Sequence, residues 1–177
     1  MNPPSVLAVA GSLAVAAGGV LSARRDFLVV GLAAQAAGVV ALGAAGAAVL
    51  LGAPSVGSAF TGGAGVGLGI DPLTGFFLVT LAVAGVPALI YALGYLPPVH
   101  NASVVGGLTA GFVLALAGVL TARTVLTLLT FWELMTLLPA GAILVTRHEP
   151  AARRSVYQYL AITHLGGTGV WVGGSGV

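Results

Sequence analysis

The chain has 177 residues, of which 58% are hydrophobic and only 6% are charged, and its mean hydropathy is +1.11. Soluble domains carry about 25% charged residues, so this composition excludes an ordinary soluble domain and favours a protein whose surface faces lipid. The pI of 9.5 arises from six arginines set against two aspartates and two glutamates, which does not indicate a nucleic-acid surface, and the lack of cysteine excludes disulfides, thiolate metal sites and thiol nucleophiles.

Two apolar runs open the chain. The hydrocarbon core of a bilayer is about 30 Å thick, so a helix that crosses it needs roughly 20 apolar residues. Residues 5–23 and 27–51 meet this length and are separated by a polar break at residues 24–26. A secretory signal peptide begins with a basic region, which residues 1–5 do not have, so the first run is predicted to be a retained membrane helix.

Both runs are rich in alanine and glycine. Small residues such as Gly31, Ala34, Gly38 and Gly46 let helix backbones approach closely in lipid. Gln35 is the lone polar side chain of the second run, and we interpret it as a hydrogen-bonding group between helices in preference to a ligand-binding residue.

Glycine, serine and proline then mark residues 52–69, "GAPSVGSAFTGGAGVGLG", as a loop. The stretch lacks the Lys-Ser/Thr ending and the flanking strand and helix of a phosphate-binding loop, so no nucleotide site is predicted.

The third apolar run begins at "GIDPLTGFF" and extends to about Tyr95. Asp71 before Pro72 is a good helix start, because a carboxylate caps free N–H groups and proline suits the first turn. Pro87 is expected to kink this helix. Tyr91 and Tyr95 fit an aromatic belt at the membrane interface.

Three further helices are predicted. The fourth covers residues 104–121 and the fifth covers residues 124–146, with Arg123 in a very short turn between them. A sixth span opens at Ser155, and its tail, "GGTGVWVGGSGV", is so rich in glycine that we expect it to be short or irregular past Gly166. The predicted fold is an all-α, polytopic membrane protein with about six transmembrane helices.

The arginines predict the orientation of these spans, because cytoplasmic loops carry an excess of lysine and arginine. The loops after the first, third and fifth spans share one side of the membrane and hold every arginine except Arg123. Arg147, Arg153 and Arg154 are interpreted as topology signals, with contact to lipid headgroups as a second reading. The prediction is a multi-pass protein of the inner (plasma) membrane with its N-terminus outside.

Glu133 is the one charged residue within the fifth span. An ionisable group at mid-membrane costs about 2.5–3.5 kcal/mol and usually faces a protein interior or a water cavity. Thr130 and Thr136 each lie about 60° from Glu133 around the helix and are predicted to form a supporting polar face. A carboxylate that changes partner can take up and release a proton near neutral pH, so we interpret Glu133 as a proton carrier. The alternative is a structural glutamate that is neutral or paired.

Two stretches resemble a known family. "GIDPLTGFFLVTLAVAGVPALIYALGYL" resembles the third span of the antiporter-like subunits of complex I and of membrane-bound NiFe hydrogenases. "LTFWELMTLLPAGAILVTRHEPAARRSVYQYLAITHLGG" resembles their fifth span and the start of their sixth, and is closest to the hydrogenase-4 component B and formate hydrogenlyase type. The resemblance covers residues 70–167, whereas the first two spans match only in hydropathy.

The resemblance implies redox-driven proton translocation, with the family's fifth-span glutamate falling on Glu133. In the family this glutamate pairs with a lysine on the seventh span, and further lysine or histidine residues continue a hydrated path. Family members have many more spans, and this chain has no lysine. Residues 1–69 would then be two N-terminal membrane helices with a glycine-rich loop, and residues 70–177 the truncated start of the antiporter-like, proton-translocating domain.

His164 lies seven residues after Tyr157, so both lie on one helix face. We interpret His164 either as a proton-relay residue near Glu133 or as a packing histidine that is hydrogen-bonded to a neighbouring span. His100 and His148 lie in predicted turns and are expected to face solvent.

We therefore expect the N-terminal part of a proton-translocating subunit of a membrane-bound hydrogenase or NADH:quinone oxidoreductase complex. Its expected partners are other membrane subunits of such an assembly, the lipid bilayer and protons, but not nucleic acid. It would have no catalytic centre or cofactor of its own, since no cysteine can ligate an iron–sulfur cluster and no dinucleotide fingerprint lies between a strand and a helix. The alternatives are a subunit of a multisubunit cation/proton antiporter, which has the same fold, and a non-conducting structural membrane module.

Overall fold

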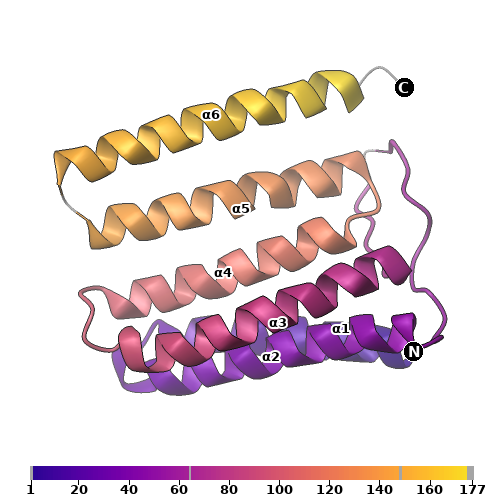
Figure 1. Ribbon diagram of the computed structural model, residues 1–177, viewed down its shortest axis with the longest axis horizontal. Coiled ribbons are helices and arrows are strands. Elements are labelled where there is room, and N and C mark those ends of the chain that lie inside the picture. Colours follow the sequence, from indigo (N-terminus) through magenta and orange to yellow (C-terminus); the bar gives the residue numbers. More distant parts are fainter. Residues whose placement is uncertain (1, 64, 148, 175–177) are drawn as a thin grey trace.

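The computed structural model describes residues 2–63, 65–147 and 149–174, and in this part of the chain the regular structure is helical (Figure 1). The elements, in chain order, are α1 (Pro3–Ser22), η1 (Arg25–Phe27), α2 (Leu28–Leu50), α3 (Pro72–Tyr95), α4 (Ala102–Thr121), α5 (Val125–Thr146) and α6 (Pro150–Gly174). The loop between α2 and α3 forms isolated β-bridges, but no strand occurs among the described residues. The prediction of an all-α fold is confirmed.

The helices α1 to α5 are each long and apolar enough to cross a membrane, judged by length and composition over the described residues. The helix α6 is not among them. Its first half carries Arg153, Arg154 and Gln158, and its second half is rich in glycine. The sixth membrane crossing therefore stays a prediction.

The helix α6 is longer at both ends than expected. It begins at Pro150 and not at Ser155, and its backbone stays helical to Gly174, so the prediction of a short or irregular end past Gly166 is wrong. A glycine costs about 1 kcal/mol relative to alanine inside a helix. Each residue added to an existing helix also gains a backbone hydrogen bond, so propagation from the preceding turns outweighs the local preference of these glycines.

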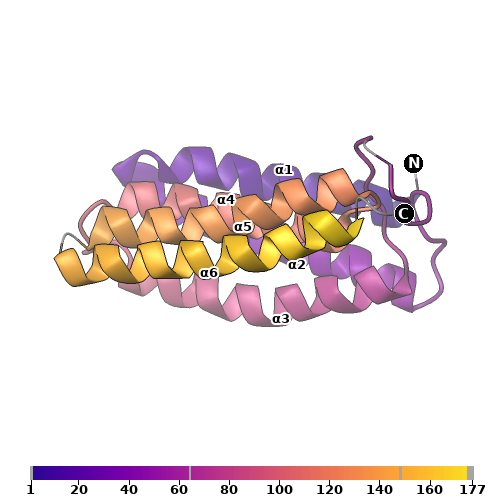
Figure 2. The same ribbon diagram turned by 90° about the horizontal axis from the view of Figure 1, so that it is seen from above.

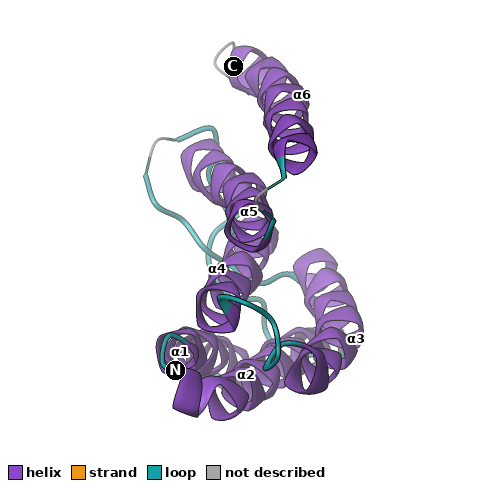
Figure 3. Ribbon diagram, turned by 90° about the vertical axis from the view of Figure 1, so that its left-hand side faces the viewer, coloured by secondary structure: helices purple, strands orange, loops and turns teal. Residues whose placement is uncertain are grey.

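The helices α1, α2 and α3 form a layer, and α4, α5 and α6 follow one another in a row on one side of it. In this layer α1 packs along α2, and α2 packs along α3 (Figures 1 and 2). The helix α4 lies against α1, α5 packs on α4, and α6 packs on α5. The last two helices thus extend away from the layer, as the end-on view in Figure 3 shows. Within the described chain, α6 is held mainly by α5.

Glycines explain how closely the first helices approach. A Cβ atom added to Gly38 would lie 2.6 Å from the carbonyl oxygen of Gly11, and one added to Gly18 would lie 2.5 Å from that of Gly31. On the other side of α2, a Cβ atom added to Gly46 would lie 2.5 Å from a carbonyl oxygen of α3. Only a residue without a side chain fits at these distances, so the predicted role is confirmed for Gly31, Gly38 and Gly46, whereas Ala34 is half-buried.

Gln35 is fully buried where α1, α2 and α4 meet. Its Nε2 donates to Ser22 Oγ on α1 and to the carbonyl oxygen of Gly106 on α4, each at 3.1 Å. The Ser22 hydroxyl donates in turn to the carbonyl oxygen of Gly18 at 2.8 Å. The prediction that Gln35 joins helices by hydrogen bonds is confirmed.

The start of α3 also agrees with the prediction. Asp71 Oδ1 accepts a hydrogen bond from the backbone N–H of Thr74 at 2.8 Å and so caps the helix. The helix then continues through Pro87 to Tyr95. Near its end the exposed rings of Tyr91 and Tyr95 stack with their centroids 5.4 Å apart.

The connections after α1, α3 and α5 lie at one end of the bundle. Arg25 Nη2 donates to the carbonyl oxygen of Pro97 at 3.4 Å, which links the first two connections, and Asn101 Nδ2 donates to that of Val145 in the last turn of α5 at 3.1 Å. We call this the arginine end, because it carries Arg24, Arg25, Arg147, Arg153 and Arg154. The α2–α3 loop and the α4–α5 connection with Arg123 lie at the opposite end (Figure 1).

Candidate functional site

The carboxylate of Glu133 on α5 meets the imidazole of His164 on α6. Glu133 Oε2 lies 2.9 Å from His164 Nε2. Both side chains come from the interiors of long helices, and α6 runs alongside α5 (Figure 1). The sequence predicted that His164 could lie near Glu133, and the structure brings the two together as a hydrogen-bonded pair, which we call the Glu133–His164 pair.

The second ring nitrogen of His164 limits where its protons can be. His164 Nδ1 lies 2.8 Å from the carbonyl oxygen of Leu160, one turn back on α6. A carbonyl oxygen can only accept, so Nδ1 carries a proton. Nε2 can then accept a proton from a neutral Glu133 carboxyl group, or donate one to its carboxylate as part of an imidazolium. One proton between Glu133 Oε2 and His164 Nε2 is therefore enough for this hydrogen bond, and this proton can reside on either side chain.

The pair lies at the edge of the α5–α6 contact and not in a sealed core. The side chain of Glu133 is 32% exposed and that of His164 is 45% exposed in this chain. Gly167, which follows His164 by three residues on α6, is buried, and a Cβ atom added there would lie 3.4 Å from Glu133 Oε1. That is an ordinary contact distance, so a methyl group fits at this position but a larger side chain would meet the carboxylate.

Thr130 and Thr136 lie on α5 one turn before and one turn after Glu133. The hydroxyl of Thr130 donates to the carbonyl oxygen of Leu126 at 2.8 Å, and this threonine is exposed. The hydroxyl of Thr136 is buried and donates to the backbone carbonyl oxygen of Glu133 at 2.9 Å. Both hydroxyls thus bond to the backbone of their own helix and not to the carboxylate, and their role as a supporting polar face stays a prediction.

The other predicted residues lie away from the pair. Arg147, Arg153 and Arg154 are exposed at the arginine end, and their interpretation as topology signals stays a prediction. His100 is exposed in the turn after α3, and Tyr157 is exposed on α6. His148 lies outside the described residues.

The structure contains one ion pair that the sequence analysis did not predict. Arg123 Nη2 lies 3.1 Å from Asp71 Oδ2, although Asp71 was interpreted only as a helix cap and Arg123 only as a turn residue. One feature of the sequence could have indicated this pair. Asp71 and Arg123 are the two charged residues at the predicted end that lies opposite the arginine end, and their charges are opposite. The backbone hydrogen bond from Thr74 holds the pKa of Asp71 below its ordinary value, and the positive charge of Arg123 acts in the same direction.

The described residues include no group of three histidine, cysteine, aspartate or glutamate side chains that could hold a metal ion. A carboxylate and an imidazole in hydrogen-bond contact, as in the Glu133–His164 pair, can exchange a proton.

Comparison with known proteins gives distant relatives. No protein-family model and no solved structure matches the chain. The chain is similar to two proteins from strains of Mycobacterium tuberculosis, called Uncharacterized protein MT0090 and Uncharacterized protein Rv0083. It is 31% identical to each over 109 residues, which make up 62% of this chain and 17% of the relative. The chain thus spans about one sixth of the length of these relatives.

Proposed function

We propose that this chain is the N-terminal part of a proton-translocating, antiporter-like subunit of a membrane-bound hydrogenase or NADH:quinone oxidoreductase complex. The observation that carries the proposal is the contact of 2.9 Å between Glu133 and His164. A carboxylate within an apolar helix usually marks a site of function. Imidazole is the side chain best suited to exchange a proton with it near neutral pH.

The transfer of a proton from Glu133 to His164 does not change the net charge of the pair. A proton that arrives on the Glu133 carboxylate makes it neutral beside a neutral imidazole. Its transfer to His164 Nε2 leaves a carboxylate beside an imidazolium, and the pair again has no net charge. Since an unpaired charge in an apolar setting is costly, this exchange has a lower barrier than a step that ionises one residue alone. Release from His164 to a further acceptor leaves the carboxylate ready for the next proton.

The bundle around the pair suits this role. The five apolar helices α1 to α5 provide the membrane setting. We propose that α6 is the sixth crossing, because it runs alongside α5 and holds the imidazole against it. With the arginine end in the cytoplasm of the cell, the positive-inside rule puts the N-terminus outside the inner membrane.

The rest of the path is proposed to lie in a longer protein and its partners. The chain covers only 17% of each of its two relatives, and this supports the proposal of a longer protein. The Glu133–His164 pair is partly exposed on α5 and α6, and this leaves room for further spans beside it. In the proposed assembly these spans supply the cationic partner of Glu133, and other membrane subunits couple proton movement to redox chemistry.

The test is the substitution Glu133→Gln in the full-length parent. Gln keeps the size of Glu and can donate a hydrogen bond to His164 Nε2, but it cannot ionise. The complex should assemble, and its proton uptake in vesicles should fall to background. The matched control is Glu149→Gln, which changes the other glutamate of the chain at the arginine end and should leave uptake unchanged.

Two further measurements sharpen the test. The variant Glu133→Asp, which can still ionise on a shorter side chain, should retain part of the uptake. The 177-residue chain alone should conduct no protons in vesicles, because the further spans are missing. Equal proton uptake by the wild-type and Glu133→Gln complexes would make Glu133 a structural residue and overturn the proposal.

A further inference from the structure

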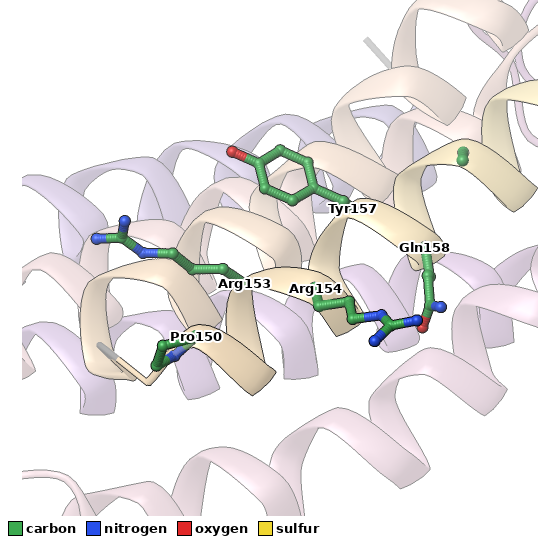
Figure 4. A pocket seen from close by; sticks show the side chains of 6 residues that line it. Pro150, Arg153, Arg154, Tyr157 and Gln158 are labelled. Carbon is green, nitrogen blue, oxygen red and sulfur yellow. The ribbon is translucent and has the colours of Figure 1, made fainter.

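A hollow of about 480 Å³ lies on one face of the first half of α6 (Figure 4). The residues that line it are Pro150, Arg153, Arg154, Tyr157, Gln158 and Ala161. They recur every three or four residues, so they form one continuous stripe along the helix. The polar side chains of this stripe are two guanidinium groups, a phenol and an amide. All of them can donate hydrogen bonds, and no carboxylate lines the hollow.

The two arginines flank the hollow. Arg153 and Arg154 are adjacent in the sequence and so leave the helix about 100° apart. In Figure 4 they extend to opposite sides, with the amide of Gln158 beside Arg154 and the ring of Tyr157 above the stripe. Both arginines are exposed. Two guanidinium groups on either side of a hollow can both donate to one phosphate group, and their planar forks suit bidentate contact with its oxygens.

The surroundings add to the positive charge. The stripe lies at the arginine end, where Arg24, Arg25 and Arg147 are also found. The acids at this end are Asp26 and Glu149, and Glu149 directly precedes α6. The arginines therefore outnumber the acids, and the first N–H groups of α6 contribute a further favourable field for an anion.

Toward the middle of the helix the stripe continues through His164 and Leu165, and Ile162 lies beside it. Tyr157 is 68% exposed, Ile162 is 71% exposed and Leu165 is 75% exposed. Tyrosine prefers the headgroup level of a bilayer, and exposed aliphatic side chains below it face hydrocarbon. A ligand on this side of the helix would thus meet cations and hydrogen-bond donors at one end and the exposed side chains of Ile162 and Leu165 beyond them.

We propose that this hollow binds the phosphate headgroup of an anionic phospholipid, with the acyl chains along the exposed side chains of Ile162 and Leu165. Charge complementarity selects the anionic headgroup, because a cluster of basic residues at the cytoplasmic surface attracts anionic lipid. The apolar continuation selects a lipid over free phosphate. The lining of the hollow does not include His164, which lies farther along the same face, so the site does not depend on proton translocation. It rests on the proposed crossing of the membrane by α6.

The experiment measures lipid binding to the purified chain in a non-ionic detergent. Phosphatidylglycerol and phosphatidylcholine with the same acyl chains are titrated in turn, and bound lipid is counted by native mass spectrometry. Phosphatidylglycerol should bind at lower concentration and phosphatidylcholine should not compete with it. The double substitution R153Q/R154Q should weaken phosphatidylglycerol binding about tenfold or more, since each basic residue near a membrane surface adds measurably to attraction of anionic lipid.

The matched control is R24Q/R25Q, which removes the same charge from the same end but leaves the hollow intact. It should weaken phosphatidylglycerol binding much less than R153Q/R154Q does, because it lowers the general positive field and leaves the side chains that line the hollow in place. If R153Q/R154Q does not purify as a monodisperse protein, R153K/R154K replaces it. That variant keeps the charge without the bidentate fork and should lose several-fold in affinity.

A third arm adds inorganic phosphate at millimolar concentration, which should neither bind detectably nor displace phosphatidylglycerol. Equal binding of the two lipids would overturn the proposal. An equal loss of affinity in R153Q/R154Q and R24Q/R25Q would also overturn it, because it would show a general charge effect. Displacement of the lipid by inorganic phosphate would show an anion site without lipid specificity.

Discussion

Arg123 Nη2 lies 3.1 Å from Asp71 Oδ2 and 3.2 Å from Thr74 Oγ1, so one guanidinium group holds the start of α3. The hydroxyl of Thr74 donates to the carbonyl oxygen of Leu120 at 3.1 Å, which ties α3 to the end of α4. The backbone N–H of Arg123 donates to the carbonyl oxygen of Gly67 at 2.8 Å and secures the α2–α3 loop. Only 8% of Arg123 is exposed, so this junction joins three segments through a buried cation.

The substitution Arg123→Gln should therefore destabilise the folded chain. It removes the cation that Asp71 and Thr74 bond, and hydrogen bonds to charged groups contribute about 1.5–3 kcal/mol each. The unfolding midpoint in detergent should fall. Arg147→Gln, at an exposed arginine of the other end, should change it little. Equal midpoints for the two variants would show that the junction adds no stability.

The pKa of Asp71 predicts how stability depends on pH. Its folded value lies below the ordinary value of 3.8, chiefly because Thr74 N–H donates to the carboxylate. A group with a depressed folded pKa adds stability above its unfolded pKa, and that contribution is lost as the pH falls through the folded value. The stability of the wild type should thus drop as the pH falls below about 4, and the drop should be smaller in Asp71→Asn. Unfolding midpoints between neutral pH and pH 3 test this, and parallel curves would contradict it.

The substitution Gly38→Val should separate α1 from α2. A Cβ atom at Gly38 would lie 2.6 Å from the carbonyl oxygen of Gly11, and backbone cannot move aside as a flexible side chain can. Overpacking of this kind costs about 1–3 kcal/mol. Gly94→Val is the control, because a Cβ atom at this helical glycine of α3 meets nothing within 4 Å. Unfolding of both variants in detergent measures the difference, and a cost as large for Gly94→Val would point to helix propensity in place of packing.

Substitutions of Gly167 should act on the carboxylate of Glu133. A Cβ atom there would lie 3.4 Å from Glu133 Oε1, so Gly167→Ala should be tolerated. The larger side chain of Gly167→Leu should displace the carboxylate from His164 and lower proton uptake by the full-length parent, about as much as loss of a general acid or base, roughly 10²-fold or more. Gly166→Leu is the control, because a Cβ atom at Gly166 meets nothing within 4 Å. Full uptake by Gly167→Leu would show that the pair does not need this close approach.

Hydropathy and helix signals predicted much of the fold. Apolar runs of about 20 residues can satisfy their backbone in lipid only as helices, which is why the five apolar helices follow from composition. Asp71 as a cap and Gln35 as a bridge between helices were also predicted, because each has one polar role open to it in its segment. The extent of α6 was not predicted correctly, because the local glycine content says little about how far a helix propagates from its earlier turns.

The sequence by itself determined the helical class, the membrane-compatible composition, the gathering of five arginines at the connections of one side, and Glu133 as the residue that an apolar span would not carry without a reason. Only the tertiary structure decided which groups meet. The packing of α6 on α5 placed His164 at 2.9 Å from Glu133, and the meeting of two connections placed Arg123 at 3.1 Å from Asp71. Both contacts join residues on different helices or connections. Helical periodicity sets the direction in which each side chain points, but the distance between two helices depends on how their surfaces pack.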